Sequence, residues 1–232
     1  MGKGKKLQVK KDFGEILDSS MDTMEETRFR KRNQNLMVKL SRKYHFNFTE
    51  VERLLLIYYK LSKESKDPRV GVDKTQFRDV LHCALDMTDD SLMDRIFLAL
   101  DKGPSAFISM ETWIASLSVF LRGTFEEHIH FCFSVYDIMG DGILSRDTMT
   151  NLLKNSIVSQ TGDDDAEETA RDMIEVITKK MDIDRDGKIS FNDYKQSVVK
   201  QPMLLEVFGQ CLPTRTDIHT FVTTFTNDIG KM

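Results

Sequence analysis

The chain has 232 residues, of which 40% are hydrophobic and 30% are charged, and its formal net charge at pH 7 is −4. This composition is typical of a soluble protein with one large or two small domains, and no apolar run reaches the roughly 18 residues that a membrane helix needs. The three cysteines, Cys83, Cys132 and Cys211, lie far apart and form no CxxC pair, which favours a reducing compartment and argues against a zinc site.

The first 43 residues are basic, with twelve Lys and Arg against six Asp and Glu, so residues 44–232 carry a net charge of −10. We expect residues 1–38 to form a flexible arm that either contacts an anionic surface, such as a microtubule, a membrane or nucleic acid, or stays solvated. The opening MGKGKK is similar to a myristoylation signal, but Lys6 stands where that signal has Ser or Thr.

Four copies of one helix–loop–helix template follow this arm. Apolar residues recur at helical spacing before and after twelve-residue loops at 65–76, 101–112, 137–148 and 182–193. The loop starts are 36, 36 and 45 residues apart, and the long step contains the acidic segment TGDDDAEE (161–168), which we expect to be a linker. The spacing therefore predicts an all-α fold of two EF-hand pairs, over residues 39–122 and 123–200, with a C-terminal helix and tail at 201–232.

Local signals mark helix starts and loop pairing. We expect capping boxes at Thr49 with Glu52 and at Asp73 with Gln76, and a cap at Thr88. An apolar residue occupies position 8 of every loop, where EF-hands form a short antiparallel bridge, so we expect loop 1 to pair with loop 2 and loop 3 with loop 4. These residues are Val72, Ile108, Leu144 and Ile189.

The loop at 182–193 is the best candidate for a metal site. Calcium takes about six to eight oxygen ligands, which an EF-hand loop supplies from positions 1, 3, 5, 7, 9 and 12 around a glycine at position 6. The predicted ligands are Asp182, Asp184, Asp186, the Lys188 carbonyl, Ser190 and Asp193. Asp193 replaces the usual Glu and is one methylene shorter, so we expect six-coordination, weaker Ca²⁺ binding and better tolerance of Mg²⁺.

The loop at 137–148 is a weaker candidate. It keeps oxygen donors at Asp137, Asp141, the Ile143 carbonyl and Ser145. Met139 and Thr148 stand where a hard cation needs oxygen-rich ligands, and a thioether is a poor ligand for such an ion. The loops at 101–112 and 65–76 keep fewer donors still, so we expect these two hands to be structural only.

The sequence contains none of the common catalytic motifs. No HExxH, glycine-rich phosphate loop or nucleophile elbow is present, which argues against an enzyme. The apolar stretch from Met203 to Phe208 predicts either a C-terminal helix folded into a groove of the hands or a separate target contact, and we favour the first.

Three connecting segments resemble the calaxins, the calcium sensors of ciliary outer-arm dynein. They are LHCALDMTDDSLMDRIF (81–97), SLSVFLRGTFEEHIHFCFSVYD (116–137) and FGQCLP (208–213), and the resemblance runs from about Lys39 to Pro213. More remotely, the chain is similar to neuronal calcium sensors and calcineurin-B-like proteins. Calaxins bind calcium at their second, third and fourth hands, and this chain departs from them at Asp101 and at 137–148, so it resembles a divergent paralogue with a reduced calcium response.

The resemblance implies a calcium-binding regulatory or docking subunit in the cytoplasm and the ciliary or flagellar axoneme. Its implied partners are dynein heavy chain, the outer-arm docking complex and the doublet microtubule, and we expect neither a nucleic-acid nor a membrane partner. Two alternatives stay open. One is a constitutive adaptor of the docking complex with little calcium switching. The other is a regulator of a membrane channel or kinase of the neuronal calcium sensor type.

Overall fold

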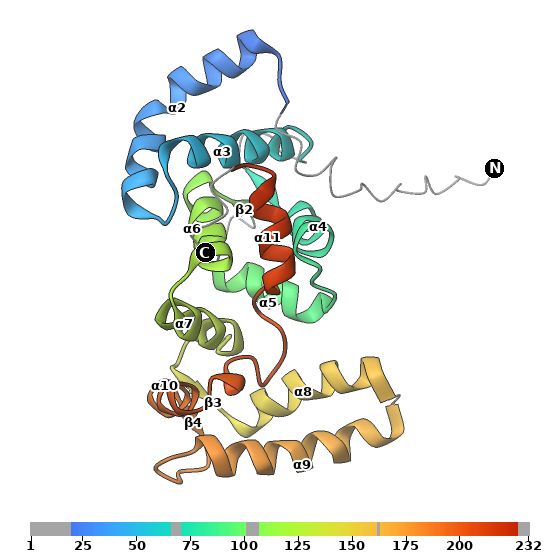
Figure 1. Ribbon diagram of the computed structural model, residues 1–232. Coiled ribbons are helices and arrows are strands. Elements are labelled where there is room, and N and C mark those ends of the chain that lie inside the picture. Colours follow the sequence, from blue (N-terminus) through green and yellow to red (C-terminus); the bar gives the residue numbers. More distant parts are fainter. Residues whose placement is uncertain (1–19, 66–70, 101–106, 162, 227–232) are drawn as a thin grey trace, which may run out of the picture.

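The computed structural model describes residues 20–65, 71–100, 107–161 and 163–226, with side chains given throughout except at 155–167. These residues form helices joined by loops and by two short ladders, so the predicted all-α class is confirmed. Figure 1 shows α3 to α6 in one half of the molecule and α7 to α10 in the other. The hands are α3 (Phe48–Lys63) with α4 (Lys74–Leu85), α5 (Asp90–Leu100) with α6 (Met110–Arg122), α7 (Phe125–Tyr136) with α8 (Arg146–Thr161), and α9 (Asp163–Met181) with α10 (Phe191–Lys200).

The loops pair as the apolar residues at position 8 predict. The strands are β1 (Val72–Asp73), β2 (Phe107–Ile108), β3 (Ile143–Leu144) and β4 (Ile189–Ser190). In the first antiparallel ladder Val72 lies opposite Ile108, and in the second Leu144 lies opposite Ile189. All four side chains are fully buried, so each ladder closes the end of its own core.

Aromatic side chains with polar tips tie the N-terminal pair together. Trp113 of α6 is buried and donates its indole N–H to the Leu54 carbonyl of α3 at 3.0 Å. Tyr58 of α3 donates its hydroxyl to the Ile108 carbonyl of β2 at 2.8 Å, and burial raises the pKa of Tyr58 to about 12. Phe77 of α4 packs edge-on against Trp113 with ring centroids 6.4 Å apart. This core uses no loop carboxylate, so the two helix pairs can persist without a bound ion.

Residues 1–38 are not one flexible arm, because α2 (Thr23–Lys43) runs across the predicted boundary. Asp22 caps this helix by accepting hydrogen bonds from the backbone N–H groups of Met24 and Glu25 at 3.1 and 3.2 Å. Hydrophobic burial against α3 holds α2 in place. Its buried residues are Phe29, Met37 and Leu40. The part of the predicted arm at residues 1–19 lies outside the described residues.

Arg122 ties together the connector between the two halves. Its guanidinium donates to the His45 carbonyl at 2.9 Å and makes two bonds, of 2.9 and 2.7 Å, to the buried carboxylate of Glu50. Across the connector, His45 Nε2 lies 2.9 Å from a carboxylate oxygen of Glu127, in the first turn of α7. Arg122, at the end of α6, therefore holds the first turn of α3 directly, and His45 extends this contact to the first turn of α7.

The C-terminal segment returns to the N-terminal half. Residues after α10 form the 3-10 helix η1 (Pro202–Leu204), and the helix proper is α11 (Arg215–Thr223), which contacts α4 and α6 (Figure 1, red). The predicted apolar stretch is only partly folded inward, because Phe208 packs edge-on against Tyr136 whereas Met203 is 84% exposed. The predicted C-terminal helix thus lies further along the chain and covers the other half of the molecule.

Aromatic contacts hold α11 and the residues after it. Phe225 packs edge-on against Phe46 with ring centroids 5.9 Å apart, and its carbonyl accepts a hydrogen bond from Arg53 of α3 at 3.1 Å. Phe221 and Val222 of α11 are fully buried. The C-terminal segment is therefore part of the core of the N-terminal half.

Helix starts and the long step differ in detail from expectation. The observed caps are Asn47 with Glu50 for α3, Asp73 with Gln76 for α4, and Asp89 for α5. The box at Asp73 is thus confirmed, whereas the predictions at Thr49 and Thr88 are two residues late and one residue early.

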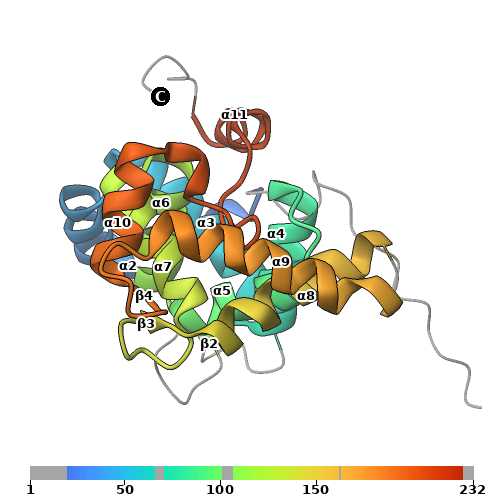
Figure 2. The same cartoon turned by 90° about the horizontal axis from the view of Figure 1, so that it is seen from below.

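The predicted linker at 161–168 is largely helical, because longer helices absorb the extra residues, and Figure 2 shows α8 and α9 side by side. No helix among the described residues is long and apolar enough to cross a membrane.

Candidate metal centre

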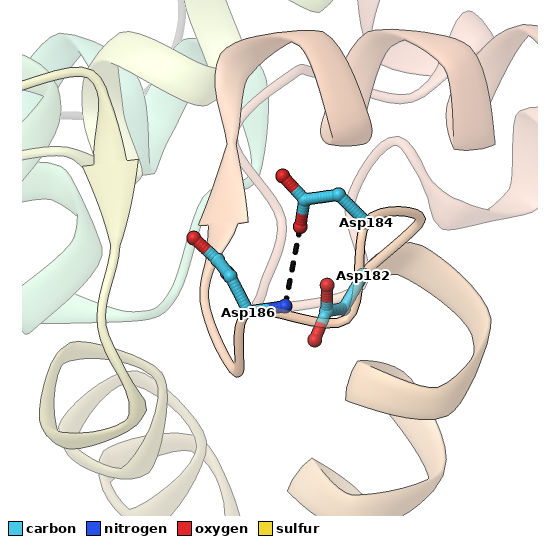
Figure 3. A group of neighbouring side chains, drawn as sticks. All are labelled: Asp182, Asp184 and Asp186. Atoms are coloured by element: carbon cyan, nitrogen blue, oxygen red, sulfur yellow. Dashed lines mark hydrogen bonds between the residues drawn. The ribbon is translucent and has the colours of Figure 1, made fainter.

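The loop between α9 and α10 gathers three carboxylates. Asp182, Asp184 and Asp186 each offer one oxygen, and these oxygens all lie within 4.8 Å of one another. Figure 3 shows the three side chains around the same turn of the loop. Asp182 is half-buried and the other two are exposed, so a cation would reach this group directly from solvent.

Backbone N–H groups of the loop hold all three carboxylates in position. Asp182 accepts hydrogen bonds from the N–H of Arg185 at 2.7 Å and from the N–H of Gly187 at 2.9 Å, one on each carboxylate oxygen. Asp184 accepts from the N–H of Asp186 at 3.2 Å. Because these bonds come from the loop's own backbone, the carboxylates are oriented by the loop itself.

The loop turns at two residues in the left-handed region. Arg185 has a φ of 63° and Gly187 a φ of 84°, and the same two positions of the preceding loop are Gly140 at 69° and Gly142 at 77°. Glycine adopts this conformation freely, whereas a side chain costs about 1–2 kcal/mol. The loop at 182–193 therefore carries backbone strain at Arg185 that the loop at 137–148 avoids.

The carboxylates repel one another electrostatically. The hydrogen bond from the Asp186 N–H lowers the pKa of Asp184, but partial desolvation and the nearby carboxylates of Asp186, Asp193 and Asp182 outweigh it and raise the pKa above its usual value. A group with a raised folded-state pKa loses stability as the pH rises through that pKa, so the ionised loop is the less stable form. A bound cation would relieve this repulsion and would compete with protons for the same oxygens.

The remaining predicted ligands of this loop serve its backbone and the next helix. Lys188 donates its N–H to Asp186 at 2.8 Å. Asp193 is buried, lies outside the group of three, and accepts from the N–H and hydroxyl of Ser190 at 3.1 and 2.5 Å in the capping box of α10. The structure thus brings together three of the six predicted ligands, and the roles of Lys188, Ser190 and Asp193 as ligands stay predictions.

The loop at 137–148 repeats the same backbone pattern. Asp137 accepts from the N–H groups of Gly140 and Gly142, both at 2.8 Å, and Asp141 accepts from the N–H of Ile143 at 3.0 Å. The loop has therefore kept the conformation that its neighbour uses to orient carboxylates.

The two substituted positions of that loop provide no charged ligand. The Met139 side chain is 83% exposed, and Thr148 forms a hydroxyl–hydroxyl hydrogen bond of 3.0 Å with Ser145. This pair occupies the place that Ser190 and Asp193 take in the last loop, so it caps α8 without adding a negative charge. Binding of an ion by Asp137, Asp141, Ile143 and Ser145 stays a prediction.

Acidic residues of the first two loops serve other purposes. Asp73 caps α4, as its place before that helix predicts. Glu111 accepts hydrogen bonds from Lys43 and Lys39 of α2 at 2.8 and 3.3 Å, and Lys43, followed by Lys39, holds the pKa of Glu111 below its usual range. Asp101 lies outside the described residues. The described acids of these loops are thus committed to helix capping and to the contact with α2.

The donor set at 182–193 fits a hard divalent cation. It offers carboxylate oxygens from three alternate positions and no sulfur or imidazole, which suits Ca²⁺ or Mg²⁺ and not a soft transition metal. A helix–loop–helix unit with this loop, paired through a short ladder with a second such unit, defines an EF-hand protein.

Comparisons with known proteins agree with this class and refine it. Residues 126–199 match the family described as EF-hand domain pair. The chain is 45% identical to calaxin of Xenopus laevis over 179 residues, which cover 76% of this chain and 86% of that protein. It is 43% identical to calaxin of Homo sapiens over 187 residues, covering 79% and 89% of the two chains. Guanylyl cyclase-activating protein 1 of Lithobates pipiens is 26% identical over 148 residues, covering 64% and 69%. The chain therefore belongs to the calaxin family.

Proposed function

We propose that this protein is a calcium-responsive regulatory or docking subunit of axonemal outer-arm dynein that modulates ciliary or flagellar motility. The observation that carries the metal response is the convergence of Asp182, Asp184 and Asp186 in one preformed loop. Membership in the calaxin family supports the location in the cytoplasm and axoneme and the partners, which are dynein heavy chain, the docking complex and the doublet microtubule.

The residues around this loop indicate how it would act. A cation held by the three aspartates would supply the positive charge that the loop lacks, as the raised pKa of Asp184 indicates. Asp193 lies at the start of α10, and Tyr194 of that helix donates a hydrogen bond to the Leu205 carbonyl in the C-terminal segment. The loop is therefore connected, through α10 and this hydrogen bond, to the segment that leads to α11. By this route the presence or absence of a bound cation would affect the N-terminal half.

Isothermal titration calorimetry with Ca²⁺ and with Mg²⁺ tests the metal site. We expect wild type to give a binding heat for Ca²⁺, and Asp186→Asn to weaken the affinity at least about tenfold, since it removes one of three charges. Asp141→Asn is the matched control, because it makes the same change at the same position of the preceding loop, and we expect it to leave the main binding step unchanged. A wild-type chain that gives no metal-dependent heat would disprove the site.

A second candidate, the constitutive adaptor, is favoured by the loss of charged ligands at Met139 and Thr148 and by the use of Glu111 to bind α2. Binding to purified dynein heavy chain and docking complex, measured with Ca²⁺ and with a chelator, separates the two. The proposed function predicts an affinity that changes with Ca²⁺. Equal binding in both conditions would favour the adaptor, and failure to bind either partner would contradict both.

A further inference from the structure

One helix of the molecule carries an unbalanced charge. From Thr27 to Lys43, α2 contains seven Lys and Arg and no Asp or Glu. A basic last turn is common in helices because it complements the helix dipole, which accounts for Arg42 and Lys43. The dipole does not account for Arg28, Lys31 and Arg32, which lie nearer the start of the helix.

Three of the seven cations of α2 are paired with acids. Lys39 and Lys43 bind Glu111 of α6, and Arg30 contacts Glu26 and Glu52. The remaining acid of the helix, Glu25, is bound by Lys63 and by Tyr59 of α3. The acidic groups that surround α2 in the described structure are thus already engaged.

The other four cations form what we call the basic stripe, Arg28, Lys31, Arg32 and Arg42. All four are exposed, and none forms a salt bridge with another described residue. Their spacing places them along one side of the helix, away from the side that carries the buried Phe29, Met37 and Leu40. At about 1.5 Å per residue the stripe is roughly 21 Å long. Figure 1 shows that α2 lies at the opposite end of the molecule from α8 and α9.

The chemistry of the stripe favours a short acidic polypeptide as its occupant. Nucleic-acid surfaces interleave cations with exposed aromatic rings, and the aromatic residue of α2, Phe29, is buried. Membrane-bound helices present a row of apolar residues beside their cations, whereas the apolar side of α2 is packed against α3 and Met24 in the first turn is its one large exposed apolar side chain. A vesicle or a duplex would also extend past the helix towards residues 44–232, which carry a net charge of −10. A short acidic segment can stay on the helix.

We propose that the basic stripe of α2 is a docking surface for an acidic polypeptide segment of another protein. This proposal deepens the proposed function by giving the chemistry of a partner, but it does not depend on the metal response, because α2 contacts the N-terminal hands and the stripe is far from the loop at 182–193. The contact would hold with or without Ca²⁺ and would weaken as the salt concentration rises.

Fluorescence anisotropy with a labelled poly-glutamate peptide of about twelve residues tests the proposal on the full chain, in chelator and at about 50 mM salt. The test variant is Arg28→Gln/Lys31→Gln/Arg32→Gln, which keeps helix-forming residues. The control is Lys180→Gln/Lys200→Gln/Arg215→Gln, which removes the same charge from exposed positions elsewhere. We expect about a tenfold or larger loss of affinity for the test variant and less than about threefold for the control.

Three results would overturn the proposal. These are unchanged peptide binding by the test variant, equal losses in both triple variants, and tighter binding of wild type to phosphatidylserine vesicles or to duplex DNA than to the peptide. Circular dichroism confirms that the variants fold. If the triple variant does not fold, single Arg28→Gln and Arg32→Gln chains replace it, each with an expected loss of about twofold to threefold, and no loss in either would contradict the proposal. Loss of the metal response with intact peptide binding would affect only the proposed function.

Discussion

At the scale of single residues, the two C-terminal loops differ in side chains and not in backbone. Asp137 and Asp182 each accept hydrogen bonds from the N–H groups at positions 4 and 6 of their loops. Charge is missing only at Met139 and Thr148. The loop at 137–148 thus keeps the conformation of a metal site but lacks two of its charged ligands. Substitutions at these two positions should therefore restore metal binding.

Met139→Asp with Thr148→Glu should create a second metal site, because the two changes restore carboxylates at positions 3 and 12 on a backbone that already turns correctly. Calorimetry should show about one additional Ca²⁺ per chain relative to wild type. Met139→Asp alone is the control and should bind more weakly, since it lacks the bidentate ligand. An unchanged stoichiometry in the double variant would show that the loop lacks more than its side chains.

Gly71→Ala should destabilise the first ladder. Gly71 has a φ of 144°, and a Cβ there would lie 2.5 Å from the Ile108 carbonyl oxygen and 2.6 Å from the Tyr58 hydroxyl, so it would disturb their hydrogen bond. We expect a loss of about 2–4 kcal/mol in the free energy of unfolding, measured in urea. Gly140→Ala is the control, because its Cβ meets open space at a φ of 69°, and it should cost only about 1 kcal/mol. Equal costs would refute the steric account.

At the scale of helices and strands, the sequence predicts the features that recur in every hand and misses those that occur only once in the chain. Periodicity and the apolar residue at position 8 give the four hands and both ladders, since these features follow local rules. α2 is missed because polar and charged residues occupy most of its positions and conceal a short apolar stripe. Two caps are misplaced because Thr49 and Thr88 lie within two residues of Asn47 and Asp89, which are the stronger capping residues and cap these helices.

The candidate site was predictable in part for the same reason. Alternating Asp residues before Gly187 are a local pattern, and the structure brings them together. The strain at Arg185 and the capping role of Asp193 depend on φ angles and on the start of α10, which ligand spacing does not encode. The pairing of Arg122 with Glu50 could not be predicted either, because the two residues lie 72 positions apart in the sequence.

Arg122→Met should cost about 3–5 kcal/mol in the free energy of unfolding, because it leaves the buried Glu50 carboxylate without its partner. Adding Glu50→Gln should recover part of this loss in urea unfolding, since the double variant no longer buries a charge. A double variant less stable than the single variant would contradict this account of the pair.

The same pair should depend on pH. Burial raises the pKa of Glu50, but hydrogen bonds from Arg122 and from the Asn47 N–H outweigh it and hold the pKa below its usual value. A lowered pKa contributes stability above the ordinary carboxyl range that is lost as the pH falls through the folded-state value. Wild type should therefore lose more stability on acidification than Arg122→Met/Glu50→Gln, and parallel pH profiles would exclude this contribution.

At the scale of the whole molecule, the chain runs from the metal loop back to the first two hands. The segment after α10 packs Phe208 against Tyr136, and α11 then buries Phe221 and Val222 against the other half. The two halves are thus joined at the connector around Arg122 and again by the C-terminal segment. A regulatory role for one metal loop requires such a physical connection between the halves.

The central claim is that the loop at 182–193 takes up a cation and that the loop at 137–148 does not do so with comparable affinity. The most direct measurement is a Ca²⁺ titration followed by amide NMR at Gly187 and Gly142, whose N–H groups donate to Asp182 and Asp137 at 2.9 and 2.8 Å. Polarisation of Asp182 by a bound cation should shift the Gly187 signal at low Ca²⁺ while the Gly142 signal stays in place. A Gly187 signal that does not move, or a Gly142 signal that moves first, would contradict the account.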